Sequence, residues 1–350
     1  MVLLIGNYPA DQQESMQRFA RMMQLGLTNA GVPTELIWPR PLLGRIRFAG
    51  GFVAKWLAYV DKFLLFPRQM RARPIVVSCH DLLAVRGALG EVEDTPASIT
   101  GKVLQGWIVA GLRRATAIAC ASRATLRDAE RLVARENGKP EILLIHHGIN
   151  HPYQKQPEEI ARRRLSEIPQ LDPARPFVLH VGSNLRMKNR EGALRIFALT
   201  KTEWNGQLVF AGQKLTPALQ ALGEELGVLD RVIEVAGPDN DLLEALYSCA
   251  MALLYPSRFE GFGWPIIEAQ ACECPVICAD REPMSEVGGD AAITFDVDDE
   301  AGFARAILRL TDPAERQRWS EHGLENVRRF AAADMIAKYV ELYRRLGVAA

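Results

Sequence analysis

Two glutamates, Glu260 and Glu268, stand on either side of a glycine turn in the stretch SRFEGFGWPIIEAQACECPVICAD, residues 257–280. The apolar run before the turn predicts a strand that ends at Ser257, and Pro265 suits the first turn of a helix, where its missing N–H costs nothing. Such a turn directs backbone N–H groups and the positive end of a helix toward a ligand. The two carboxylates can then reach different parts of one long polar ligand. The simpler alternative is a capped helix whose Glu268 is solvated.

Around this turn, short β-branched runs alternate with longer amphipathic stretches, which is typical of an α/β protein with parallel sheets and crossover helices. The predicted strands are residues 2–6, 34–38, 74–81, 116–122 and 141–148 in the first half, and 177–182, 207–212, 232–237, 251–257 and 275–280 in the second. The predicted helices lie at about residues 12–29, 51–65, 100–114, 190–199, 217–226, 240–249 and 264–273. Because glycines follow several strands, we expect ligands to bind at strand ends that line a crevice between the halves.

The composition excludes several classes of protein. Hydrophobic residues make up 48% and charged residues 24% of the 350 residues, as in a globular protein rather than a disordered or fibrous one. The first residues, MVLLIGNYPADQQES, predict a strand and not a secretory signal, and no apolar stretch is long enough to span a membrane. The six cysteines are scattered through apolar segments, so we expect reduced thiols and a cytoplasmic protein.

The net charge of zero hides a difference between the two halves. Residues 1–157 carry 20 Lys and Arg against 12 Asp and Glu, whereas residues 158–350 carry 22 against 30. Such asymmetry indicates halves with different partners. A basic half can meet nucleic acid, an anionic membrane or a phosphorylated small molecule.

The glycine turn and its neighbours resemble the family 4 retaining glycosyltransferases (glycosyl transferases group 1) of the GT-B fold. Glu260-x7-Glu268 with Gly-Phe-Gly between is similar to the signature of that family. Further stretches that are similar and occur in the family's order are residues 181–197, 208–212, 241–257 and 275–292. The resemblance is strong from about 177 to 330 and covers nearly the whole chain. It implies two Rossmann-like, doubly wound parallel-sheet domains that face each other across a cleft.

The domain boundary is expected near residue 155, because the segment 151–176 is polar and contains prolines. By the resemblance, residues 1–155 would be the N-terminal acceptor-binding domain and residues 156–333 the C-terminal nucleotide-sugar donor domain. A C-terminal helix at about 334–350 would pack back on the first domain.

The family pattern implies a role for each matching position of the turn. Glu268 would bind the ribose hydroxyls of the donor. Glu260 would hold hydroxyls of the sugar, together with the backbone N–H groups of Gly261, Phe262 and Gly263.

The loop after the strand at 177–182 would hold the diphosphate of the donor. Lys188 would neutralise it beside the backbone of Gly182 and Ser183. A leaving nucleoside diphosphate gains charge as the glycosidic bond breaks, and fixed cations and N–H dipoles stabilise that charge. Many relatives have an Arg directly after the glycine, where this chain has Ser183, and Arg186 is the candidate substitute. The alternative for Lys188 is a solvated surface lysine.

His80 ends a predicted strand, and the segment SCHDLLAVRGALGE around it resembles the acceptor-domain histidine segment of the family. By that resemblance, His80 and Glu260 would be the catalytic residues, with His80 against the donor sugar near its reacting carbon. The acceptor hydroxyl would attack from the face that the phosphate leaves, and the phosphate would take its proton. A general base and a covalent intermediate on Glu260 are therefore not expected. The alternative for His80 is a structural histidine.

No metal ion and no cofactor is expected, since the nucleotide-diphosphate sugar is a co-substrate. No Asp-x-Asp pair follows a strand in the manner of a metal–diphosphate site. Asp296-x-Asp298-Asp299 is interpreted as a solvated turn and the start of a helix.

Residues 40–73 form a basic stretch with eight Lys and Arg against Asp61 alone, interleaved with aromatic and aliphatic residues. Such a stretch can lie on an anionic membrane surface, at the inner face of the membrane. The alternative is a partly buried helix whose cations face solvent. Nucleic acid is not expected, because no recognised binding motif accompanies the charge.

These observations predict a hexosyltransferase-type enzyme of polysaccharide or glycoconjugate biosynthesis. It would move a sugar from a nucleotide-diphosphate sugar to an acceptor hydroxyl on a glycan, a lipid-linked molecule or a small molecule. The first half is short for the family, which motivates the alternative of a catalytically impaired glycosyltransferase-like protein that binds nucleotide sugars or acts as a scaffold. A GT-B epimerase or phosphorylase is a weaker alternative, because nothing supports the pyridoxal-phosphate lysine of such a phosphorylase.

Overall fold

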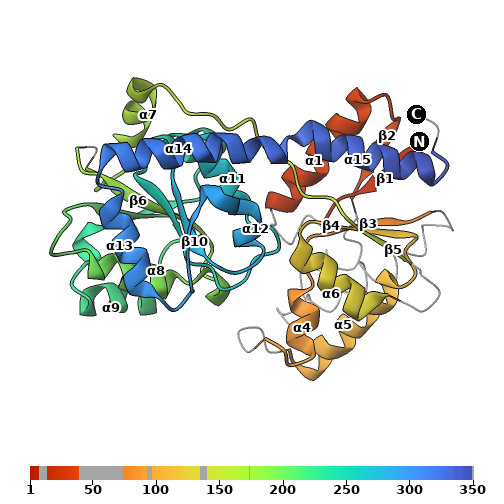
Figure 1. Ribbon diagram of the computed structural model, residues 1–350. Helices are drawn as coiled ribbons and strands as arrows, with labels where there is room; N and C mark the ends of the chain where they lie inside the picture. Colours follow the sequence, from red (N-terminus) through yellow and green to blue (C-terminus); the bar gives the residue numbers. More distant parts are fainter. Residues whose placement is uncertain (8–13, 39–73, 93–96, 135–139, 173, 349–350) are drawn as a thin grey trace, which may run out of the picture. The chain divides into compact units, whose positions relative to one another are not determined.

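A computed structural model describes residues 1–7, 14–38, 74–92, 97–134, 140–172 and 174–348 (Figure 1). The chain divides into two compact units, one of residues 1–76 with 332–350 and the other of residues 77–331. The domain boundary near residue 155 stays a prediction. The predicted helix at 51–65 and the basic stretch 40–73 lie outside the described residues.

The first unit contains a two-stranded parallel sheet of β1 (Val2–Ile5) and β2 (Thr34–Ile37). The connection includes α1 (Glu14–Asn29), a crossover helix of the kind that parallel strands require. The C-terminal helix α15 (Ala332–Arg345) packs on α1. A Cβ atom added to Gly26 would lie only 2.5 Å from Ile336 Cγ1, so the two helices approach where α1 has no side chain.

The second unit contains a six-stranded parallel sheet in the order β11-β10-β9-β6-β7-β8. Its strands are β6 (Phe177–Gly182), β7 (Gln207–Gly212), β8 (Val232–Ala236), β9 (Ala252–Tyr255), β10 (Val276–Ala279) and β11 (Ile293–Phe295). Counted from β6, this is the doubly wound order 3-2-1-4-5-6, which reverses between β6 and β9. In such sheets a ligand binds outside the carboxyl ends of the strands, at this point of reversal.

Helices cover both faces of this sheet, as the doubly wound order requires. Helices α8 (Arg190–Leu199), α9 (Pro217–Glu225) and α13 (Glu300–Arg309) pack together on one face. Helices α7 (Glu158–Leu165), α10 (Asn240–Cys249), α11 (Trp264–Ala271) and α14 (Pro313–Val327) lie on the other, with the short α12 (Met284–Gly288) beside α11 (Figure 1). The strands are almost wholly buried and apolar, which is typical of a parallel sheet covered on both faces.

The second unit also contains a three-stranded sheet in the order β3-β4-β5. It is built from β3 (Val76–Cys79), β4 (Ala117–Cys120) and β5 (Glu141–Leu144), with α4 (Leu83–Ala88), α5 (Ile99–Leu112) and α6 (Arg123–Val133). The predicted strands 74–81, 116–122 and 141–148 are thus observed shorter at their ends. Their last residues make other hydrogen bonds instead: Ser122, for example, caps α6 by accepting from the Thr125 N–H.

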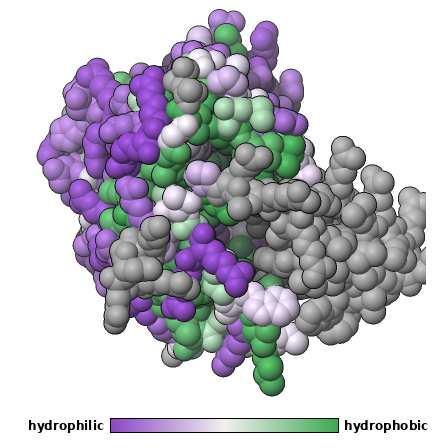
Figure 2. Space-filling model, turned by 90° about the vertical axis from the view of Figure 1, so that its right-hand side faces the viewer, coloured by the Kyte–Doolittle hydropathy of each residue, from purple (hydrophilic) through white to green (hydrophobic). Residues whose placement is uncertain are grey.

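Helix α5 is apolar on both sides. Its exposed side carries Ile99, Val103 and Trp107 on successive turns, with Trp107 54% exposed. Hydrophobic patches also interrupt the hydrophilic surface of the face in Figure 2. Along the described parts of the chain, every helix is too short or too polar to cross a membrane.

His180 lies in the middle of the large sheet, on β6, and is fully buried. Its Nδ1 lies 3.1 Å from the carbonyl oxygen of Leu254. Burial, with the nearby charge of Arg190 as the second cause, lowers the pKa of His180 to about 3, from an ordinary value of 6.5. The unfolded chain therefore binds a proton at a higher pH than the folded protein does.

This pKa difference predicts a loss of stability in acid. The stabilisation is fully present above pH 6.5 and is lost as the pH falls from there toward 3. At pH 5 the loss from this one group is about 2 kcal/mol of the free energy of unfolding. We expect urea unfolding of wild type to lose about that much more free energy between pH 7 and pH 5 than the His180→Gln variant loses. Equal losses in the two proteins would contradict this account.

Candidate functional site

The loop after β6 crosses the point where the strand order reverses. It runs through the short 3₁₀ turn η3 (Arg186–Lys188) to Asn189, which has a left-handed backbone with φ 52° and caps α8 by accepting from the Gly192 N–H at 3.2 Å. The Asn189 amide also donates to the carbonyl oxygen of Pro256 at 3.0 Å, just after β9. One buried side chain therefore joins the loops that follow β6 and β9.

Arg190 sets the shape of this loop, although no sequence motif points to it. Its guanidinium donates to the carbonyl oxygens of Gly182 at 2.6 Å and Gln213 at 2.7 Å, and to Asn184 Oδ1 at 2.7 Å. Burial lowers its pKa to about 10, so it stays protonated at neutral pH. Since all three hydrogen bonds of its guanidinium go to atoms of the surrounding loops, Arg190 has a structural role there. The predicted substitute, Arg186, is exposed in η3.

Lys188 and Glu260 form an ion pair across the two loops. The Lys188 ammonium lies 2.7 Å from Glu260 Oε1 and 2.8 Å from Oε2, and the two side chains are only 18% and 10% exposed. The fully buried Tyr255, at the end of β9, donates its hydroxyl to Glu260 Oε1 at 2.6 Å and accepts from Lys188 at 3.2 Å. The alternative of a solvated Lys188 is therefore wrong. Tyr255 was not predicted, because its hydrogen bonds depend on the fold.

Glu268 is buried rather than solvated. Helix α11 begins at Trp264 after Gly263, whose φ of 98° is a left-handed conformation that glycine adopts readily. Glu268 lies one turn into the helix and is 4% exposed, and the hydroxyl of Tyr247 from α10 donates to its Oε2 at 2.9 Å. The capped helix with a solvated Glu268 is thus ruled out. A buried carboxylate needs polar partners, and the Tyr247 hydroxyl is one of them.

The turn with Gly261 touches the end of β3. A Cβ atom on Gly261 would lie 2.6 Å from the carbonyl oxygen of His80, so only glycine fits this approach. The Ser122 hydroxyl donates to the Gly261 carbonyl oxygen at 3.0 Å, and the Thr125 hydroxyl donates to that of His80 at 3.2 Å. The predicted catalytic histidine therefore lies beside the turn that carries Glu260.

His80 also belongs to a group of stacked rings. Its Nδ1 lies 2.7 Å from Nε2 of His147, which follows β5, and the ring of His147 stacks on Trp264. Phe262, predicted to offer its backbone N–H, is buried with its ring edge-on to His147. Burial lowers the pKa of His80 to about 4 and that of His147 well below its ordinary value. Both imidazoles are therefore neutral at pH 7.

The acidic loop at 296–299 has the structural role that the sequence predicts. Asp299 caps α13 by accepting from the Gly302 N–H at 2.8 Å, and Asp296 accepts from the Asp298 N–H at 3.0 Å. Within the described ranges, no three His, Cys, Asp or Glu side chains are grouped so as to hold a metal ion. Lys188 and the N-terminus of α11 are positive groups at the site.

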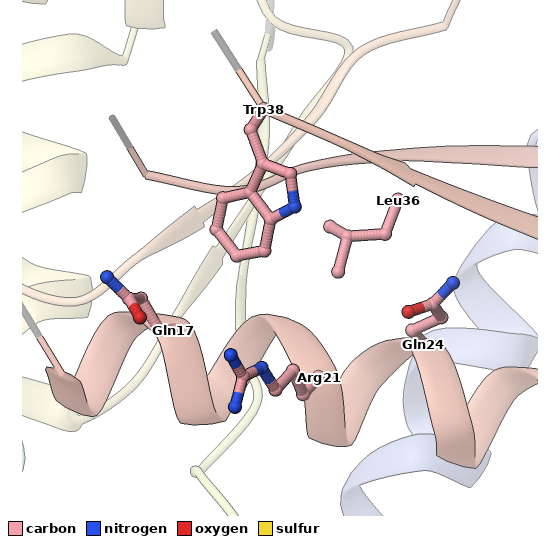
Figure 3. A pocket seen from close by; sticks show the side chains of 5 residues that line it. All are labelled: Gln17, Arg21, Gln24, Leu36 and Trp38. Carbon is pink, nitrogen blue, oxygen red and sulfur yellow. The ribbon is translucent and has the colours of Figure 1, made fainter. Parts of the chain in front are cut away.

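A separate hollow lies in the first unit, where α1 faces β2 and the residue after it. Figure 3 shows its lining side chains, which are Gln17, Arg21, Gln24, Leu36 and Trp38. It contains none of the residues predicted for donor binding or catalysis.

The buried phenol of Tyr255 allows a test of the charged pair. We expect Tyr255→Phe to lower the free energy of unfolding by about 1.5–3 kcal/mol, because a buried hydrogen bond to a charged group is lost while the ring is kept. Urea unfolding at pH 7 measures this, with Tyr343→Phe at another buried tyrosine as the matched control. A loss below about 0.5 kcal/mol would mean that the bond to Glu260 is not made.

The close approach at Gly261 is tested by adding one methyl group. We expect Gly261→Ala to lower the free energy of unfolding by about 1–3 kcal/mol, because the new Cβ atom meets backbone rather than a mobile side chain. Gly106→Ala in α5 is the matched control, since its Cβ meets nothing within 4 Å and should stabilise the helix by about 0.5–1 kcal/mol. Equal effects of the two substitutions in urea unfolding would refute the close contact.

Comparisons with known proteins agree with the geometry of the second unit. The family model described as "Glycosyl transferases group 1" matches residues 161–326, which include Lys188, Glu260 and Glu268. The O-antigen chain mannosyltransferase B of Escherichia coli is 31% identical over 177 residues, which are 49% of this chain and 46% of that protein. The chain spans 46 to 63% of the length of the first curated relatives that it matches.

Solved structures show the same fold. Sucrose-phosphate synthase from Thermosynechococcus elongatus has a TM-score of 0.76 at 22% identity, with 99% of each chain covered. HepE from Anabaena, solved in complex with UDP and glucose, has a TM-score of 0.64 at 18% identity, covering 92% of this chain and 88% of that one. At such identities the likeness shows the fold, which is the predicted GT-B fold with two Rossmann-like parts. Residues 161–326 are thus similar to the group 1 glycosyltransferases, and the fold of the chain is the GT-B fold.

Proposed function

We propose that the protein is a retaining, metal-independent glycosyltransferase that moves a sugar from a nucleoside-diphosphate sugar to an acceptor hydroxyl. The observation that carries this proposal is the Lys188–Glu260 pair, held at the point where the order of the large sheet reverses. A cation and a carboxylate in contact there match a ligand with an anionic diphosphate and a polar sugar. The complex of HepE with UDP and glucose shows that a protein of this fold binds both parts.

Each end of the donor has a partner in this proposal. Glu268, buried one turn into α11, binds the ribose hydroxyls. Lys188 binds the diphosphate, beside the backbone of Gly182 and Ser183. Without a donor, Lys188 is neutralised by Glu260 at 2.7 Å, so an arriving diphosphate shares the ammonium and Glu260 turns toward the sugar hydroxyls.

Catalysis follows from the charge that develops as the glycosidic bond breaks. The leaving diphosphate gains negative charge, and Lys188 with the N-terminal N–H groups of α11 stabilises it where little water competes. The acceptor hydroxyl attacks from the same face and passes its proton to the departing phosphate oxygen. Glu260 holds the sugar and forms no bond to its anomeric carbon. His80 contacts the sugar near that carbon.

Metal independence is part of the proposal. Lys188 and the positive end of α11 supply the charge that a divalent cation provides in other transferases. Adding a chelator should therefore leave the transfer rate unchanged.

The acceptor carries a hydroxyl on a glycan, a lipid-linked molecule or a small molecule, and residues 1–155 would bind it. The name of the Escherichia coli mannosyltransferase refers to a glycan chain, which supports the first of these classes. A cytoplasmic protein with peripheral membrane contact through residues 40–73 stays a prediction, because that stretch lies outside the described residues.

The proposal predicts which variants lose the donor. We expect Lys188→Ala and Glu268→Ala to weaken binding of a nucleotide sugar by about 10- to 100-fold, as loss of a charged hydrogen bond requires. Binding and slow hydrolysis are measured by calorimetry and product release over a panel of nucleotide sugars. Lys201→Ala and Glu225→Ala, which remove the same charges from exposed positions elsewhere on the second unit, are the matched controls.

Three outcomes separate the alternatives. If no nucleotide sugar binds, or both site variants bind as well as wild type, the site assignment is wrong. If wild type binds a donor but neither hydrolyses nor transfers it with any acceptor, the impaired or scaffold alternative replaces the proposal. Transfer by wild type alone supports the enzyme.

A further inference from the structure

His147 is in direct contact with the predicted catalytic histidine. Its Nε2 lies 2.7 Å from Nδ1 of His80, a hydrogen-bond distance, and the two ring centroids are 4.7 Å apart. The two residues come from different strand ends, since His80 follows β3 and His147 follows β5. No motif of the sequence assigned a role to His147.

The ring of His147 is held from two sides. It stacks on Trp264 with a centroid distance of 4.6 Å and an angle of 9° between the planes, while Phe262 meets it edge-on at 5.2 Å. Trp264 is itself fixed, because its indole N–H donates to the carbonyl oxygen of Gly148 at 3.1 Å. The orientation of His147 is thus set by the first residue of α11, next to the turn that carries Glu260.

Both rings of the pair are neutral at pH 7, because burial is the first cause that lowers each pKa. A neutral imidazole has one nitrogen that donates and one that accepts, so a bond between two such rings fixes the position of both protons. Two arrangements satisfy the contact. Either His147 donates from Nε2, or His80 donates from Nδ1.

The first arrangement is favoured by the intrinsic chemistry of the ring. Neutral histidine prefers the tautomer with its proton on Nε2. If His147 donates from Nε2, both rings take that tautomer, whereas the opposite arrangement places both in the less stable Nδ1–H form. We propose that His147 is a positioning residue that donates from Nε2 to His80 Nδ1 and so holds the proton of His80 on Nε2.

This assignment gives His80 a defined chemical property. A single tautomer with its proton on Nε2 makes that nitrogen a hydrogen-bond donor, suited to an oxygen of the donor sugar or of its leaving phosphate. This catalytic meaning rests on the function proposed above. The tautomer itself does not, because it follows from the contact between the two rings.

Nitrogen-15 NMR of the histidine rings in the full-length protein tests the tautomer without any substrate. We expect His80 Nδ1 to be unprotonated and to show scalar coupling across the hydrogen bond to the Nε2–H of His147. His147→Phe should abolish this coupling, and His322→Phe, at an exposed position on α14, should leave it intact. A proton on His80 Nδ1, or no coupling in wild type, would overturn the proposal.

Kinetic measurements on two variants distinguish a role of His147 in positioning His80 from a role in ring packing alone. His147→Phe keeps a flat ring on Trp264 but has no donor, whereas His147→Gln keeps an N–H donor at similar reach but loses the stack. We expect kcat to fall about tenfold or more in His147→Phe and less than about threefold in His147→Gln, with the donor KM within about twofold in both. Circular dichroism confirms that each variant is folded.

The opposite order, with His147→Phe more active than His147→Gln, would show that the stack alone matters and would overturn the positioning role. If wild type transfers no sugar, the proposed function fails while the NMR result still decides the tautomer.

Discussion

The parallel pairing of β6 with β9 is the constraint on which the site depends. Because the strand order reverses between them, the loops after both strands open at the same edge of the sheet while their helices cross to opposite faces. Asn189 then joins the two loops through its bond to Pro256. Lys188 and Glu260, 72 residues apart in the sequence, meet at 2.7 Å as a result.

Charge is distributed unevenly over the site, and burial explains the pattern. A partly buried ion pair is weak evidence for stability, because the cost of desolvating two ions offsets most of their attraction. The Lys188–Glu260 pair, whose side chains are 18% and 10% exposed, is a pair of this kind. His80 and His147 are kept uncharged at pH 7 by the same desolvation.

The second constraint on the site is the close contact between Gly261 and the main-chain carbonyl of His80. A main-chain carbonyl can approach the glycine turn only where no Cβ atom intervenes, and Ser122 then bonds to the same turn. This explains chemically why the turn has glycine on both sides of Phe262. One glycine allows close contact with β3, and Gly263 allows the left-handed start of α11.

The sequence alone determined many of the elements around the candidate site and the types of its residues. The strands 177–182 and 207–212 and the helices 190–199 and 240–249 are confirmed to the residue, because their apolar periodicity and flanking glycines are local signals. The resemblance of the Glu260 turn to the group 1 glycosyltransferases rests on residue types and spacing in the same way. What each predicted site residue does with a ligand stays a prediction.

Only the tertiary structure decided which side chains meet. Tyr255, Arg190 and His147 carry no signal in the sequence, since a buried tyrosine, arginine or histidine is indistinguishable there from one that faces solvent. Their roles come from hydrogen bonds between segments far apart in the chain, whose geometry is set by strand order and packing rather than by local sequence. The same reason explains Glu268, whose burial beside Tyr247 no local pattern predicts.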